Sequence, residues 1–278
     1  METVDDFGLT GERNAATGSI PQQRVVEKLD DYMSHRDYAG AERHLLYWLD
    51  EARAIGDQRG ELMVRNELVG HFRKTANKDQ SLANAREALK LVDELGFGNT
   101  ISAGTTYVNA ATACNAFGEN ERSLELFEAA ARIYEHNERT APHLLGGLYN
   151  NMALVCIALR KFDEADMLYK RALATMADVE NGELEQAITY LNMADAVVAR
   201  TGWEHGGDAE AALQDSACEA EVERLLDTAI ELLDTPSVPR DGYYAFVCEK
   251  CAPTFGYYGY FLVNADLRER ARAIYESH

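Results

Sequence analysis

Apolar residues recur along this chain at three- and four-residue intervals, in stretches that short polar turns separate. From Val25 onward the pattern alternates between a helix, a short turn and a second helix. The clearest stretch is 147–176. Its first helix places four apolar residues at positions i, i+3, i+4 and i+7: Tyr149, Met152, Ala153 and Cys156. This spacing predicts one apolar face of an α-helix.

After the turn at 160–161, the same stretch continues into a second helix with a small-residue face. Ala165 and Ala172 flank Tyr169 on that face. Small residues allow two antiparallel helices to approach closely, and the tyrosines fill the space beside them. Because such a pair cannot bury its apolar stripes alone, neighbouring pairs are expected to stack.

Asparagines recur at a nearly constant interval, which indicates a repeat array. The four positions are separated by 43, 42 and 41 residues: Asn66, Asn109, Asn151 and Asn192. Three of the asparagines have a similar local sequence, because a tyrosine lies two positions before each of them: Tyr107, Tyr149 and Tyr190. The period near 42 residues therefore predicts a chain of repeated helix pairs.

The unit Tyr149-x-x-Met-Ala-x-x-Cys, followed by Ala165-x-x-x-Tyr-x-x-Ala-Leu, resembles the tetratricopeptide repeat (TPR). The resemblance covers about residues 22–278. Its period exceeds the ~34 residues of the common repeat and is similar to the long repeats of kinesin light chains and Gram-positive peptide sensors. The resemblance implies an all-α fold, a right-handed α-solenoid of about six TPR-like helix pairs.

The expected organisation is a flexible tail over residues 1–20 and a TPR superhelix over 21–278. Within the superhelix we expect an irregular acidic insertion at about 202–221. Residues 204–234 hold ten acidic residues and a single basic one, Arg224. A capping repeat rich in aromatic residues is expected over 240–278, with Pro253 kinking or restarting its helix.

Acidity changes the set of partners to be considered. The formal net charge is −20, so nucleic acid and anionic membrane surfaces are not expected partners. A cationic peptide or protein is electrostatically favoured, although acidity can also serve solubility alone. There is no long apolar span or secretory signal in the sequence, so a cytoplasmic location is the expectation.

The asparagine row is the best candidate for a binding site, because a side-chain amide offers both a donor and an acceptor. In the resembling proteins, the first helix of each pair lines a concave groove, and asparagines hold peptide backbone there. Carried over, the candidate groove residues are Asn66, Asn109, Asn150, Asn151, Asn192, Asn115, Asp195 and Arg73. The alternative is that these amides bond to neighbouring helices and set the geometry of the array.

Candidate chemistry is sparse. Cys248 and Cys251 form a lone CxxC without a second ligand pair, which favours packed thiols over a metal site. No phosphate-binding loop or nucleophile motif occurs, so we predict no catalytic residue, metal or cofactor.

The predicted function is a non-catalytic scaffold that holds an extended peptide or a partner's tail in its groove. One alternative is an assembly scaffold that acts through the acidic insertion or the end faces, including a homodimer through the C-terminal aromatic segment. Another is an enzyme or small-molecule binder with a pocket near the C-terminal cap.

Overall fold

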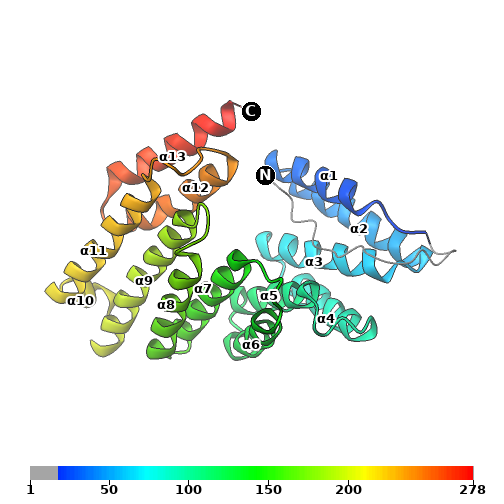
Figure 1. Cartoon of the computed structure of the whole chain (residues 1–278), viewed down its shortest axis with the longest axis horizontal. Coiled ribbons are helices and arrows are strands. Elements are labelled where there is room, and N and C mark those ends of the chain that lie inside the picture. Colours follow the sequence, from blue (N-terminus) through cyan, green and yellow to red (C-terminus); the bar gives the residue numbers. More distant parts are fainter. Residues whose placement is uncertain (1–17, 278) are drawn as a thin grey trace. The chain divides into compact units, whose positions relative to one another are not determined.

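The computed structural model describes residues 18–277, which form thirteen helices and no strand. The chain divides into two compact units, whose described parts are residues 18–140 and 141–277. We call them the N-terminal unit and the C-terminal unit (Figure 1).

The N-terminal unit consists of three helix pairs. In chain order the helices are α1 (Gln22–Ser34), α2 (Tyr38–Ile55), α3 (Gln58–Lys74), α4 (Lys78–Glu94), α5 (Ile101–Ala116) and α6 (Asn120–His136). The first helices α3 and α5 also contact each other directly. Of the segment predicted to be a flexible tail, residues 1–17 lie outside the described range. Ile20 is buried in the core with Val25 and Leu45.

The C-terminal unit also contains three pairs, one of which is interrupted. Its helices are α7 (Pro142–Ala158), α8 (Phe162–Met176), α9 (Glu183–Glu204), α10 (Ala209–Leu213), α11 (Ser216–Leu233), α12 (Gly242–Tyr257) and α13 (Phe261–Glu276). The first helices α7, α9 and α12 follow one another, because α9 contacts both of the others. The predicted set of about six helix pairs is thus confirmed.

The packing of α7 against α8 follows the spacing of the sequence. Tyr149, Ala153 and Cys156 on α7 are buried, and so are Ala165 and Tyr169 on α8. The alanines have no exposed surface, which lets the two helix backbones approach closely.

The irregular repeat departs from the register of the others. α9 runs for 22 residues and ends at Glu204, so it includes the first residues of the predicted insertion, Gly202 and Trp203. The guanidinium of Arg160 lies 3.6 Å from the centre of the Trp203 ring, a cation–π contact that holds the turn between α7 and α8 against the end of α9. The acidic stretch after it forms two helices, α10 and α11, which Gln214 and Asp215 separate.

The helix does not restart at Pro253, because α12 continues through this residue to Tyr257. Pro253 is on the exposed side of the helix. Cys248 and Cys251 of the same helix are buried free thiols. Burial raises the pKa of the Cys251 thiol to about 12, so these cysteines pack as apolar side chains.

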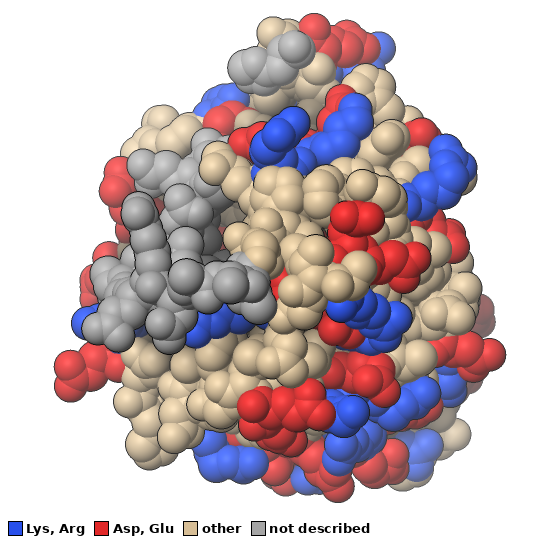
Figure 2. All heavy atoms as spheres, turned by 90° about the vertical axis from the view of Figure 1, so that its right-hand side faces the viewer, with Lys and Arg blue, Asp and Glu red and all other residues tan. Residues whose placement is uncertain are grey.

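On the face shown in Figure 2, basic and acidic residues are interspersed and do not form a patch of one sign. No helix of residues 18–277 is long and apolar enough to cross a membrane.

Candidate ligand-binding face

Two clusters of hydrogen-bonded amides connect successive first helices, one cluster in each unit. In the N-terminal unit, Asn66 Nδ2 on α3 donates to Thr106 Oγ1 on α5 at 3.0 Å. Asn109 Nδ2, also on α5, donates to Asn66 Oδ1 at 3.1 Å. We call Asn66, Thr106 and Asn109 the N-terminal amide cluster.

The C-terminal unit repeats this arrangement between α7 and α9. Asn150 Nδ2 donates to Thr189 Oγ1 at 2.9 Å, and Asn192 Nδ2 donates to Asn150 Oδ1 at 3.0 Å. These three residues form the C-terminal amide cluster. In both clusters the threonine precedes the donor asparagine by three residues, so one helical turn presents both side chains to the neighbouring helix.

The threonines determine how the amides are oriented. Thr106 Oγ1 donates its hydrogen to the Ser102 carbonyl at 3.0 Å, and Thr189 Oγ1 does the same to the Glu185 carbonyl at 2.9 Å. Each hydroxyl can then only accept from the incoming amide. The nitrogen of Asn66 must therefore face Thr106, and its oxygen must face Asn109, so the network itself excludes the flipped amide.

In each cluster, one asparagine that is not fully buried keeps both an acceptor and a donor. Asn66 uses both amide hydrogens, because Nδ2 also donates to the Leu62 carbonyl at 3.2 Å. Asn150 is buried. Asn109 and Asn192 are half-buried, and each keeps a carbonyl oxygen and one amide hydrogen without a partner within residues 18–277. A donor beside an acceptor matches the two groups of a peptide unit.

The structure changes the register of the predicted row at one position. Sequence similarity aligned Asn151 with Asn109, but Asn150 makes the bonds to α9. Asn151 is half-buried and beside the cluster. Sequence reasoning missed Thr106 and Thr189, although the Thr-x-x-Asn spacing that they share was available as a signal.

The other predicted residues lie outside the two clusters. Asn115 is half-buried on α5, and Arg73 is exposed in the last turn of α3. Asp195 on α9 accepts a hydrogen bond at 2.8 Å from Oη of Tyr258, the residue that directly follows α12. Neighbouring helices desolvate Asp195 and raise the pKa of its carboxyl, while the bond from Tyr258 acts in the opposite direction.

Glu67 adds an unusual carboxyl beside the N-terminal amide cluster. It follows Asn66 directly on α3, and burial raises its pKa to about 6. The negative charge of Asp30 on α1 contributes in the same direction. The charged form of Glu67 is therefore disfavoured, and this carboxyl loses its proton only as the pH rises through about 6.

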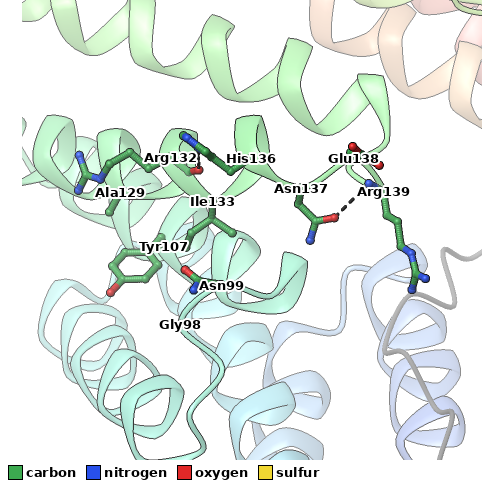
Figure 3. Close-up of a pocket in the computed structure, with 10 residues that line it drawn as sticks. All are labelled: Gly98, Asn99, Tyr107, Ala129, Arg132, Ile133, His136, Asn137, Glu138 and Arg139. Carbon is green, nitrogen blue, oxygen red and sulfur yellow. Dashed lines mark hydrogen bonds between the residues drawn. The ribbon is translucent and has the colours of Figure 1, made fainter.

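A pocket of about 820 Å³ lies at the end of α6, and its lining includes the loop before α5 (Figure 3). Arg132 and Arg139 line it, but their side chains point away from each other and do not converge on one anion. His136 Nδ1 lies 2.7 Å from the Arg132 carbonyl of its own helix. The pocket thus shows no paired nucleophile and base among its lining residues.

Comparisons with known proteins agree with this architecture. No protein-family model matches the sequence, and no curated protein is similar to it. The nearly identical TPR-like repeats assigned to a kinesin light chain of Podosopora anserina match with a TM-score of 0.50 and 17% identity, over 77% of this chain and 94% of that one.

A Rap protein complexed with competence and sporulation factor matches with a TM-score of 0.53 and 14% identity, over 92% of this chain and 64% of that one. At these identities the likeness concerns the fold. It confirms the predicted TPR-type helical repeat.

Proposed function

We propose that this chain is a non-catalytic binding scaffold that holds an extended peptide segment on the face that the first helices form within a unit. Asn109 in the N-terminal unit and Asn192 in the C-terminal unit are the amides that bond to a ligand backbone, and Asn66 and Asn150 hold them in position. The observation that carries the proposal is the unused donor and acceptor on Asn109 and Asn192, in an orientation that threonines fix.

The structural role of the amides and the binding role are compatible in this account. Within each cluster, one asparagine uses its amide group for hydrogen bonds between helices. The other asparagine uses one amide hydrogen in this way and can offer its remaining groups to a ligand. The alternative was that the amides only join neighbouring helices. Asn66 has this structural role, because both of its amide hydrogens are already bonded. Asn151, Asn115, Asp195 and Arg73 are proposed to flank the ligand.

Two further considerations support this function. A Rap protein with this fold has been solved in complex with a bound factor. The net charge of −20 favours the approach of a basic segment. We therefore propose a basic peptide or protein tail as the partner.

The proposal is tested by selecting ligands from a displayed library of random peptides on the intact chain. Enriched peptides are then measured against Asn109→Ala, Asn192→Ala and the double variant. Each alanine substitution removes the two hydrogen bonds that the asparagine makes to the peptide backbone. For each cluster that the peptide contacts, this loss is expected to weaken binding about tenfold or more. Thermal unfolding of the same variants checks that the fold is kept.

Asn99→Ala is the control, because this exposed asparagine precedes α5 and lies outside both clusters. Unchanged affinity in the double variant would contradict the proposal. So would a large loss of stability that accounts for the loss of binding. If removal of the acidic surface of α11 abolished binding while the asparagine variants did not, the assembly alternative would replace the groove.

A further inference from the structure

On α9, two carboxylates flank the available amide along one side of the helix. Glu185, Asn192 and Asp195 follow at intervals of seven and three residues, which places them on a single stripe. Glu185 and Asp195 are ten residues apart, or about 15 Å along the helix axis. Asn192, with its unused donor and acceptor, lies between them.

Both carboxylates are already bonded to phenols, one near the start of α12 and one on the residue that directly follows its end. Tyr243 Oη donates to Glu185, and Tyr258 Oη donates to Asp195 at 2.8 Å. A phenol that donates to a carboxylate gains electron density in its ring, so the ring face becomes more attractive to a cation. Burial and the adjacent carboxylates raise the pKa of both phenols, so the hydroxyls remain donors at neutral pH.

Three aromatic rings of α12 remain largely uncovered beside these bonds. Tyr243, Phe246 and Tyr257 are 44%, 50% and 63% exposed, and their spacing of three and eleven residues places them on one side of the helix. Tyr243 and Phe246 are stacked with centroids 6.2 Å apart. Tyr257 meets Tyr258 edge to face at 4.9 Å. Each carboxylate therefore has a pair of rings next to it.

The chain itself shows which group suits such a site. Arginine guanidiniums lie over aromatic rings at Arg171 and Tyr149, 4.1 Å from the ring centre, and at Arg240 and Tyr244, also 4.1 Å. A guanidinium can stack on a ring and bond to a carboxylate at the same time. Aliphatic side chains would leave the negative charges of Glu185 and Asp195 without a counter-charge, and acidic side chains would be repelled by them.

Lys250 determines where the cations of a ligand can bind. It is exposed on α12, between Phe246 and Tyr257, and repels a cation at the middle of the stripe. The two ends of the stripe, at Glu185 and at Asp195, remain favourable positions for a cation. In an extended chain with about 3.4 Å per residue, side chains four residues apart are on the same face and about 14 Å apart. This matches the separation of the two carboxylates.

We propose that the surface formed by α9 and α12 binds an extended peptide segment that carries two arginines four residues apart. The inference rests on the proposed function, because Asn192 is the group that holds the backbone between the two arginines. One guanidinium contacts Glu185 and the rings of Tyr243 and Phe246. The other contacts Asp195 and the rings of Tyr257 and Tyr258.

The test uses three labelled synthetic peptides of equal length built on an alanine and serine background. The first carries two arginines four residues apart, the second carries two adjacent arginines, and the third replaces both arginines of the first by uncharged citrulline. The first peptide is expected to bind the intact chain at least about tenfold more tightly than either of the others. Because the second peptide has the same charge, general attraction to an acidic protein cannot produce this result.

Protein variants locate the site. Phe246→Ala combined with Tyr257→Ala is expected to weaken the first peptide about tenfold, and Glu185→Gln combined with Asp195→Asn is expected to remove its preference over citrulline. Phe261→Ala is the control, since Phe261 is also an exposed ring, at 69%, but belongs to α13. Equal binding of the three peptides, no binding of the first, or unchanged binding by the Phe246 and Tyr257 variant would overturn the inference.

The inference and the proposed function fail in different ways. Peptides selected from the random library could bind the Asn192→Ala variant more weakly and yet show no enrichment of paired arginines. That result would support the proposed backbone site and overturn the arginine site. If the chain associates with itself through α12, so that its mass in solution rises with concentration and Phe246→Ala with Tyr257→Ala abolishes this, a second copy is the occupant. That result would also overturn the arginine site.

Discussion

Thr106 and Thr189 each accept an amide hydrogen after giving their own hydrogen to a carbonyl one turn earlier. One hydroxyl in each cluster thereby sets the direction of every bond that follows. Without it, an asparagine could present either its oxygen or its nitrogen to the next helix. The side chain that carries the binding hypothesis is thus not an asparagine alone but a threonine and two asparagines together.

Thr189→Val tests this dependence at the level of one residue. Valine has nearly the same shape but cannot accept from Asn150 Nδ2, which is then left buried without an acceptor. We expect the free energy of unfolding to fall by about 1–2 kcal/mol, measured by urea denaturation. Thr228→Val is the control, because Thr228 donates to the Arg224 carbonyl in the same way and belongs to no cluster. Equal effects would contradict the network.

Glu67 gives a prediction of pH dependence. Its pKa of about 6 in the folded chain is above the ordinary value of 4.5, so between these pH values the folded state binds more protons than the unfolded state. Stability from this group is therefore full below about pH 4.5 and is lost as pH rises through 6. Glu67→Gln removes the dependence.

At pH 7 we expect Glu67→Gln to raise the free energy of unfolding by about 1 kcal/mol, less than the full pKa shift would give because the side chain is only half-buried. The gain should vanish near pH 4. Glu128→Gln, on the exposed surface of α6, provides the comparison. A gain that is the same at both pH values would show that Glu67 is not desolvated in solution.

At the scale of the helix, side-chain caps and glycines fix where α3 begins. Asp57 caps α3 by accepting from the Gly60 amide at 2.9 Å, and the Ile20 amide donates to its second oxygen at 3.0 Å. A Cβ at Gly60 would overlap the Asp57 carboxylate and the Ile20 side chain. Gly70, ten residues later in the same helix, has open space around the position of a Cβ.

Alanine substitutions at these two glycines should therefore have opposite signs. Gly70→Ala is expected to raise the free energy of unfolding by about 0.5–1 kcal/mol, because alanine is the better helix former. Gly60→Ala should lower it, since the overlap displaces the cap. Chemical denaturation of both variants measures the effect. Stabilisation by both would contradict the cap geometry.

Local periodicity was sufficient to predict the helix pairs, because the apolar positions of segments such as 149–172 repeat at helical spacing and are buried in the structure. The path of the irregular repeat was less accessible. The irregular insertion was predicted to begin at about residue 202, but the backbone of Gly202 stays helical and the ring of Trp203 is held by Arg160. That contact joins residues 43 positions apart, so the local sequence around Trp203 could not predict it.

The sequence predicted that asparagines recur along the first helices, but it did not predict which asparagine of α7 bonds to α9. Aligning the tyrosines selected Asn151, while α9 bonds to Asn150. One position changes the direction of a side chain by about 100° around a helix, so the choice depends on how α7 is rotated against α9. Tertiary packing decides that rotation.

At the scale of the whole molecule, each unit has its own buried core. One cluster of buried residues runs from Ile20 to Phe72, and another runs from Leu184 to Ala271. Contacts between successive helices dominate, as is typical of repeat proteins, whose stability is nearly a sum over neighbours. Unfolding therefore need not be a single all-or-none step.

Each unit contains one tryptophan, which allows this to be measured. Trp48 packs against the core of the N-terminal unit, and Trp203 belongs to α9 of the C-terminal unit. Trp203→Phe and Trp48→Phe each leave a single fluorophore. We expect the two urea midpoints to differ, whereas coincident transitions that also match the circular dichroism signal would indicate one cooperative unit.

The central claim is that Asn109 and Asn192 offer their free amide groups to a ligand backbone while Asn66 and Asn150 remain bonded within the clusters. Side-chain amide signals of chain labelled with 15N-asparagine, assigned through single Asn→Gln variants, report this directly. On titration with a library-selected peptide, we predict large shifts for Asn109, Asn192 or both, and small shifts for Asn66 and Asn150. Saturating binding that leaves the Asn109 and Asn192 signals in place would contradict the account.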